Sequence, residues 1–369
     1  MQQLKRIPHP SGSEILFDAK WHQYKLGGTA LRSVSKLLDR YFPFDEKRVL
    51  ELVSKKTGQP VATVKAGWMR QALLGKNVHE FIECKLLGKP PPAFTLLMQR
   101  RQAREASRPA DATGPAVIST TAMEDEVLHG EEALYLPVAE AAVERVLGDY
   151  DVLGAEQVIA APRWGIAGTV DFVGRNRRTN RLLIGDWKTT GSVVSNFRFG
   201  SFETPCPGVL RHLPNNKLHR YAMQVVIYGE ILARERYLEQ HFFDAALRTA
   251  LTSGAAATPP PSPPPPPPPS PRRGRPSSKA VAGVDAATTQ RRSGSGSSDV
   301  DVEQLVMDFY RNNSNEQRFE YGVVQLAKGE NGGVVAEFKE VTQATVLPPD
   351  CPEMTFENLL QRVMEGEGL

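Results

Sequence analysis

The chain has 369 residues, and 40% of them are hydrophobic, which is ample for the core of one large domain or two ordinary ones. The net charge of +3 neither requires nor excludes a nucleic-acid partner, because a basic groove can lie on a nearly neutral protein. No apolar run approaches the length that crosses a bilayer, and residues 1–18 lack the apolar stretch of a secretory signal. We therefore expect an intracellular protein that is neither secreted nor membrane-embedded; whether it is mitochondrial, nuclear or virus-encoded stays open.

The three cysteines argue against two kinds of metal centre. Cys84, Cys206 and Cys351 lie far apart, and no CxxC pair occurs in the chain. A zinc ribbon is built from such pairs, and a four-cysteine iron–sulfur cluster cannot be built from three thiolates. We therefore expect reduced thiols and no iron–sulfur cluster.

The first ordered block, residues 1–98, is predicted to form the N-terminal helical part of the protein. Residues 24–38 (YKLGGTALRSVSKLL) suggest a short strand and a turn that lead into a helix. Residues 67–88 repeat hydrophobic side chains at a helical period, and the Gly and Pro that follow would end this helix. The next stretch, 99–125, is predicted to be a loop or a frayed helix.

Residues 126–250 are predicted to hold the core of the fold. A helix is expected over about 131–147, and it is followed by three β-type runs at 155–162, 165–175 and 181–190. The last two runs are joined by the polar turn RNRRTN and are typical of a β-hairpin. A long loop then leads to a helix over 218–240.

Residues 251–300 separate this core from a C-terminal block, 301–369. Their Pro, Ser, Gly and Arg residues bury too little apolar surface to offset ordering entropy, so we expect a disordered insertion with polyproline II runs. The proline runs could also serve as ligands for SH3- or WW-type domains. In the C-terminal block, two alternating runs flank KGENGG as another hairpin, and FENLLQRVMEG is predicted to be a helix. Strands on both sides of the insertion predict one α/β fold, in which helices flank a mixed central sheet.

Two carboxylates and a lysine lie near the ends of the predicted hairpin strands. Asp171 ends the run GTVD, and Asp186 and Lys188 follow on the next strand as DWK, where residues i and i+2 point to the same face. Two converging carboxylates repel each other unless a cation lies between them, and their oxygens suit Mg²⁺ or Mn²⁺. Such an ion beside a lysine is suited to phosphodiester hydrolysis. The alternative is that the two aspartates only cap the strand ends and the lysine is solvated, which would give the same sequence pattern.

Further polar residues follow in a matching order. Gln224 and Tyr228 are spaced i, i+4 on the helix after the long loop, so they share one face. His79 lies on the predicted helix of the first block, and Glu156 lies on the strand before the hairpin. Each has an ordinary alternative, namely an amphipathic helix, a structural histidine or a solvated strand carboxylate.

Taken together, the ordered set GKNVHEFIE, GTVD, GDWKTT and QVVIY resembles the PD-(D/E)XK nuclease superfamily, in its RecB-like and lambda-exonuclease-like branch. The segment YKLGGTALRSVSKLLDRYFPFD also looks like the N-terminal part of exonuclease-like proteins from phages, large DNA viruses and mitochondria. The mitochondrial genome maintenance exonucleases are one such group. The resemblance implies a restriction-endonuclease-like α/β core. The long loop before the QVVIY helix and the Pro-rich insertion depart from the family.

The resemblance implies a metal site. Asp171 and Asp186 would bind Mg²⁺ or Mn²⁺ directly, and His79 would bind the ion or hold a water on it. The backbone carbonyl of Trp187 could add another ligand, and Glu156 is a further candidate carboxylate.

The resemblance also implies the other catalytic roles and the substrate. Lys188 would position the attacking water, and Gln224 and Tyr228 would contact the DNA backbone or brace the lysine. The implied activity is metal-dependent hydrolysis of DNA, as an exonuclease in repair, recombination or genome maintenance. A structure- or site-specific endonuclease of the same fold, or a scaffold that recruits partners through the Pro-rich segment, remain alternatives.

Several other residues allow two interpretations each. Trp164 and Trp187 could stack on DNA bases or pack in the core. Basic residues near the predicted site could hold phosphates or be solvated turn charges: Arg175, Arg177, Arg178, Arg181, Lys217 and Arg220.

Overall fold

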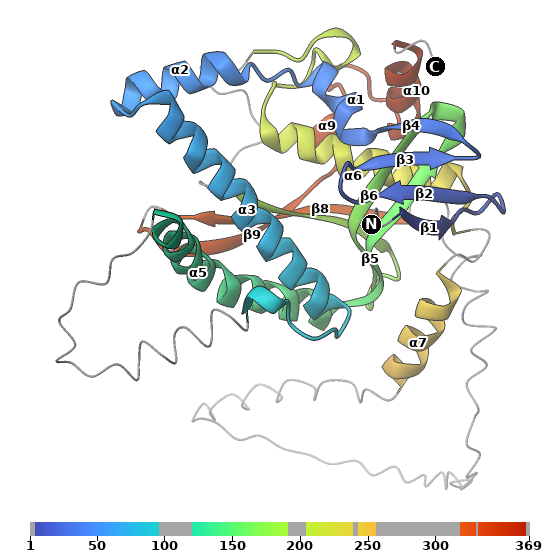
Figure 1. The fold of residues 1–369 in the computed structure, drawn as a ribbon. Helices are drawn as coiled ribbons and strands as arrows, with labels where there is room; N and C mark the ends of the chain where they lie inside the picture. Colours follow the sequence, from blue (N-terminus) through green and yellow to red (C-terminus); the bar gives the residue numbers. More distant parts are fainter. Residues whose placement is uncertain are drawn as a thin grey trace, which may run out of the picture.

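The computed structural model describes residues 4–95, 120–190, 204–238, 243–255, 318–329 and 331–366. In these ranges the chain is an α/β protein with a mixed nine-stranded sheet and helices on both of its faces (Figure 1). Among the described helices, none combines the length and the apolar character that a membrane span requires.

The sheet is continuous from the N-terminal strands to the C-terminal hairpin. Its order is β1-β2-β3-β4-β6-β7-β8-β9, and β5 pairs with β6 beside this path. The pairs β4–β6 and β7–β8 are parallel, and the other pairs are antiparallel. The strands are β1 (Leu4–Pro8), β2 (Glu14–Asp18), β3 (Gln23–Leu26), β4 (Thr29–Ser33), β5 (Tyr150–Ala161), β6 (Ile166–Asn176), β7 (Leu182–Thr190), β8 (Phe319–Lys328) and β9 (Val334–Glu340).

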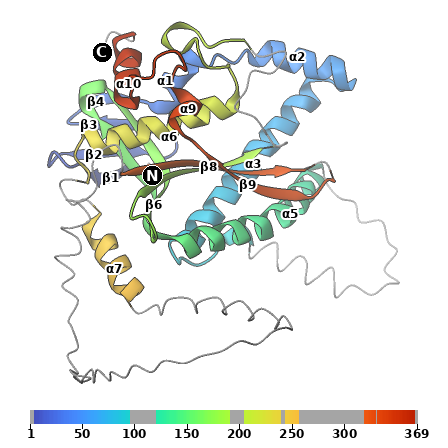
Figure 2. The ribbon, with the colours of Figure 1, turned by 180° about the vertical axis from the view of Figure 1, so that it is seen from behind.

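Helices cover the sheet from two sides. The helices are α1 (Val34–Tyr41), α2 (Glu46–Thr57), α3 (Val61–Leu86), α5 (Thr120–Asp149), α6 (Lys217–Arg234), α7 (Asp244–Ala255), α9 (Gln343–Val346) and α10 (Phe356–Gly366). Figures 1 and 2 show α3 and α5 on one face of the sheet and α6 on the opposite face. Two short 3-10 turns, Pro162–Trp164 and Gly208–Leu210, lie in the connections.

Each face of the sheet has its own hydrophobic core. On the α6 side, Ile184 of β7 packs in one cluster with Leu37 and Val225. On the α3–α5 side, Phe172 of β6 packs in a second cluster with Val78. Because successive residues of a strand point to opposite faces, β6 and β7 contribute to both cores and are held firmly between them.

Helix α6 is central to the first core. Eleven of its 18 residues are buried, since α1, α10 and the sheet all contact it. Asn216 begins the helix as an N-cap, and its side chain accepts a hydrogen bond of 2.9 Å from the backbone N–H of His219. The polar positions that remain on such a buried helix are therefore held in fixed places.

The predicted α/β class and mixed sheet are confirmed, and so are the hairpins β6–β7 and β8–β9 and the helices of 67–88 and 356–366. The sheet joins both sides of the insertion, since β7 and β8 are neighbours.

Other boundaries differ from the predictions. Strands β1 and β2 and helix α7 were not predicted. Helix α5 begins at Thr120, within the stretch predicted to be a loop or frayed helix, and α6 ends at Arg234 instead of residue 240. Helix α7 includes residues 251–255, so the predicted disordered insertion begins five residues too early; its remainder, 256–300, lies outside the described residues.

Candidate active site

The β6–β7 hairpin places Asp171 and Asp186 close to each other. The paired register of the two strands ends at Phe172 and Gly185, one residue before the two aspartates. The two carboxylates are close enough that Asp171 raises the pKa of Asp186. The Asp171 carboxylate accepts a hydrogen bond of 2.9 Å from the backbone N–H of Trp187. The hairpin register therefore brings together the carboxylates of GTVD and GDWKTT.

Asp186 is held by the lysine two residues further along the strand. The Lys188 ammonium nitrogen lies 2.8 Å from one Asp186 oxygen and 2.6 Å from the other. The Asp186 side chain is 1% exposed and the Lys188 side chain 20%, so this is an ion pair with one end near solvent. Asp186 thus faces Lys188 closely, as the i, i+2 spacing predicts.

Three other ligand-type side chains form the tightest group. His79, Glu156 and Asp171 each offer one atom, and these atoms all lie within 4.8 Å of one another. The His79 Nδ1 atom is 3.6 Å from an Asp171 oxygen. The residues come from α3, β5 and β6, so the group exists only in the folded protein.

Glu156 reaches this group from an irregular point in β5. Its neighbours Ala155 and Gln157 pair with Phe172 and Val170, which puts Glu156 across from Asp171. The backbone of Glu156 has a φ of +50°, in the left-handed region that non-glycine residues seldom occupy. Such strain is kept where the surrounding structure enforces it, and it is common at functional sites.

The pKa values of Glu156 and Asp186 are raised by desolvation first and by neighbouring negative charge second. Glu156 is an exposed residue, but desolvation by the atoms around it in the groove raises its pKa to about 8, and Asp171 and Glu83 raise it further. Burial also raises the pKa of Asp186 to about 7, against the lowering effect of Lys188 and with a raising effect from Asp171. A cation among these carboxylates would relieve this repulsion.

The pKa of His79 is lowered in the site, whereas the pKa of Lys188 is raised. Burial lowers the pKa of His79, although Asp171 and a hydrogen bond with the backbone of Trp187 raise it. Burial alone would lower the pKa of Lys188, but Asp186 and Asp171 hold it above its ordinary value. Near neutral pH the site therefore holds a neutral imidazole, which can bind a metal, and a charged ammonium group.

The donor set fits a divalent cation. One imidazole nitrogen and two carboxylate oxygens converge in the group of His79, Glu156 and Asp171, and Asp186 lies near Asp171. Carboxylate oxygens suit Mg²⁺ and Mn²⁺, and the imidazole is more favourable for Mn²⁺ than for Mg²⁺. The backbone of Trp187 adjoins His79, which keeps its carbonyl a candidate ligand.

Helix α6 adds the polar side chains of the QVVIY sequence. The Gln224 amide nitrogen donates a hydrogen bond of 3.0 Å to the Tyr228 hydroxyl. Asp186 and Asp171 help to raise the pKa of Tyr228 above its ordinary value, after burial, so its hydroxyl lies near the carboxylates. The Lys188 ammonium group also lies 5.1 Å from the centre of the Tyr221 ring.

An open groove of about 680 Å³ adjoins the group of His79, Glu156 and Asp171, whereas Asp186 and Lys188 do not line it. The groove is lined by His79, Glu156, Asp171, Gln224 and Tyr228, together with the N-terminal strands. The sequence analysis did not predict that the N-terminal strands line the groove. The alternation of apolar and polar residues in EILFD could have indicated strand β2. The residues that the N-terminal segment adds include Lys5, Phe17, His22 and Tyr24.

Most of the proposed phosphate-binding arginines have structural partners. Arg175 and Arg177 both bind Asp151, and Arg177 also donates to two carbonyls at the end of α5. Arg220 binds Asp39 at 2.8 Å, and Arg181 lies 3.9 Å from Glu320. None of the six basic residues named from the sequence lines the groove in the described part of the chain: Arg175, Arg177, Arg178, Arg181, Lys217 and Arg220.

The two tryptophans belong to the hydrophobic cores. Trp164 is 5% exposed and carries the Arg234 guanidinium over its ring at 4.1 Å, and Trp187 is 2% exposed. Neither ring has a free face for a DNA base, so the packing alternative holds for both.

No protein-family model matches the chain, and no curated protein matches it either.

Proposed function

We propose that this protein is a metal-dependent nuclease that hydrolyses phosphodiester bonds in DNA. The observation that carries the proposal is a cluster of residues that come from four separate elements, α3, β5, β6 and β7. The cluster consists of His79, Glu156, Asp171 and the Asp186–Lys188 pair. The site combines three carboxylates, of which only that of Asp186 is buried, with one imidazole and one ammonium group. Such a site is suited to polyanionic substrates only when it holds a cation.

Some residues of the site would hold the cation, and others would position the attacking water. His79, Glu156 and Asp171 would hold the cation, with Asp186 as a further carboxylate near Asp171. A divalent ion bound there supplies an activated water and stabilises charge on the phosphoryl oxygens. The Lys188 ammonium group, fixed by Asp186, is placed to orient the water and to offset the charge that develops on the phosphate.

The architecture supports a restriction-endonuclease-like core. The acidic residues lie on an antiparallel hairpin in a mixed sheet, and helix α6, which carries Gln224 and Tyr228, packs against that hairpin. Gln224 and Tyr228 then lie beside the lysine strand, where they can brace Lys188 or contact the DNA backbone. This placement follows the order of motifs in the PD-(D/E)XK superfamily.

We further propose that the enzyme is an exonuclease, in keeping with the RecB-like and lambda-exonuclease-like branch. Purified protein is expected to degrade end-labelled linear DNA with Mg²⁺ or Mn²⁺ and to stop when EDTA is added. Circular single-stranded DNA separates the two nuclease classes, because an exonuclease needs an end. Cleavage of the circle would assign the protein to the endonucleases, and no cleavage of either substrate with either metal would refute the proposed function.

Metal binding can be tested apart from cleavage. Glu156→Gln removes one charged donor of the group, so we expect Mn²⁺ affinity measured by calorimetry to fall at least about tenfold. Glu80→Gln is the matched control, because Glu80 lines the same groove but is outside the group of three. Equal Mn²⁺ affinity in wild type, Glu156→Gln and His79→Ala would remove this group from the metal site.

A further inference from the structure

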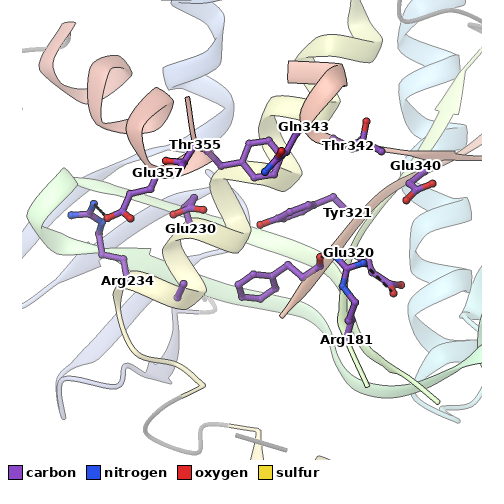
Figure 3. A pocket seen from close by; sticks show the side chains of 14 residues that line it. Arg181, Glu230, Arg234, Glu320, Tyr321, Glu340, Thr342, Gln343, Thr355 and Glu357 are labelled. Atoms are coloured by element: carbon purple, nitrogen blue, oxygen red, sulfur yellow. Dashed lines mark hydrogen bonds and ion pairs between the residues drawn. The ribbon is translucent and has the colours of Figure 1, made fainter. Parts of the chain in front are cut away.

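A second pocket lies apart from the candidate active site. It has a volume of about 560 Å³ and shares no lining residue with the groove. Its walls come from the end of α6, the start of β8, the end of β9 and the first residues of α9 and α10 (Figure 3). The volume lies in the range of small-molecule sites.

The charged side chains of this pocket do not balance. Four glutamates and two arginines line it, which gives a formal charge of −2. Arg234 binds Glu357 at 3.1 Å, and Glu320 accepts hydrogen bonds from Tyr150 and Thr179 at 3.0 and 2.9 Å. Two of the four carboxylates take no part in these contacts.

The two carboxylates left over are those of Glu230 and Glu340. Neither accepts a hydrogen bond or forms an ion pair with any residue in the described ranges. Glu230 is half-buried at the inner wall, whereas Glu340 is exposed at the rim. The inner carboxylate therefore faces the pocket without a partner.

The hydroxyl group of a largely buried tyrosine lies beside Glu230. Tyr321 is 6% exposed, and its hydroxyl finds no hydrogen-bond partner within the described part of the chain. Figure 3 shows this hydroxyl directed toward Glu230. The Phe356 ring packs edge-on against Tyr321, with 5.6 Å between ring centres. An unpaired phenol and an unpaired carboxylate that open on the same pocket offer a hydrogen-bond donor and acceptors to a ligand.

The physical state of Glu230 supports this view. Burial raises its pKa to about 7, Glu357 adds to this effect and Arg234 opposes it. A carboxylate that is held in such surroundings without a partner destabilises the folded protein near neutral pH, and proteins retain such costs mainly at functional sites.

We propose that this pocket binds an organic cation with a primary ammonium group, which Glu230 and the Tyr321 hydroxyl hold. The ammonium group can donate to both oxygens, and the aromatic rings favour a cation beside them. Divalent metals need more oxygen ligands than this pair supplies. An anion is disfavoured by the net negative charge. A polyamine or a lysine side chain of a protein partner would each supply this chemistry.

The proposal is tested by calorimetric titration of the full chain with spermidine and with an acetylated, amidated trilysine peptide. We expect saturable binding of one of them, weakened at least about tenfold by Glu230→Gln, since a charge-assisted contact is lost. Tyr321→Phe should weaken binding less. Glu365→Gln, on the exposed end of α10, is the matched control and should bind as wild type does. Preference for spermidine indicates a polyamine site, and preference for the peptide a protein partner.

A measurement of Tm shows that the variant folds. Because the pKa of Glu230 is raised in the folded state, its ionisation lowers stability as pH rises from its ordinary value of 4.5 to about 7. Glu230→Gln should therefore raise Tm more at pH 8 than at pH 5. No saturable binding of either cation, or unchanged affinity in a folded Glu230→Gln variant, would overturn the proposal.

Discussion

Lys188→Ala is expected to slow Mg²⁺-dependent DNA cleavage by roughly 10²- to 10³-fold, the effect of losing one preorganised donor at a developing negative charge. The ammonium group of Lys188 donates a hydrogen bond to one Asp186 oxygen and lies 2.6 Å from the other. Asp186→Asn should have an effect at least as large, because it removes a candidate ligand charge and the partner that orients Lys188. Initial rates on labelled linear DNA at saturating Mg²⁺ measure both effects.

The controls separate chemistry from folding. Asp186→Asn keeps the shape of the side chain, and Tm should show whether the buried pair tolerates the change. Lys25→Ala removes an exposed lysine from β3 and should leave the rate unchanged. Wild-type rates in both Lys188→Ala and Asp186→Asn would show that the hairpin pair is structural and that the nuclease site lies elsewhere.

Gly168→Ala is expected to lower stability and cleavage together. A Cβ atom at residue 168 would lie 2.5 Å from the Tyr228 ring, so the ring must move. Overpacking of this kind costs about 1–3 kcal/mol in the free energy of unfolding. Because Tyr228 accepts the hydrogen bond of Gln224 and lines the groove, its displacement should also reduce the cleavage rate.

Gly229→Ala provides the matched comparison. A Cβ atom there would lie 2.5 Å from the Tyr321 ring, so the steric conflict is similar, but Tyr321 is not in the groove. Alanine also gains about 1 kcal/mol of helix propensity within α6, which offsets part of the cost. We expect a drop in Tm with little change in cleavage rate. If Gly168→Ala lost stability but cleaved at the rate of Gly229→Ala, Tyr228 would have no part in the site.

Local patterns in the sequence were enough for much of the secondary structure. The 3.6-residue repeat of α3, the alternation of β6 and β7 and the polar turn between them are all short-range features, and they placed Asp171, Asp186 and Lys188 on one hairpin. Helix α7 and strand β1 were missed because their runs have weak periodicity, and β2 was missed because its alternation covers only five residues.

The composition of the groove depended on contacts between distant segments. Glu156 was only one candidate carboxylate in the sequence, and its place opposite Asp171 follows from the β5–β6 register. Arg175 and Arg177 were equally good candidates for phosphate binding, until Asp151 was found to hold both. A sequence pattern gives the type of a side chain, whereas its partner is decided by which elements pack together.

The sequence by itself therefore determined the α/β class, the carboxylate–lysine hairpin and the spacing of Gln224 and Tyr228, because these depend on residues a few positions apart. Only the tertiary structure decided that His79 of α3 and Glu156 of β5 meet Asp171, and that Glu230 and Tyr321 share a second pocket. The physical reason is that strand register and helix packing join segments that are far apart in the chain, and burial then sets the charge state of the groups they bring together.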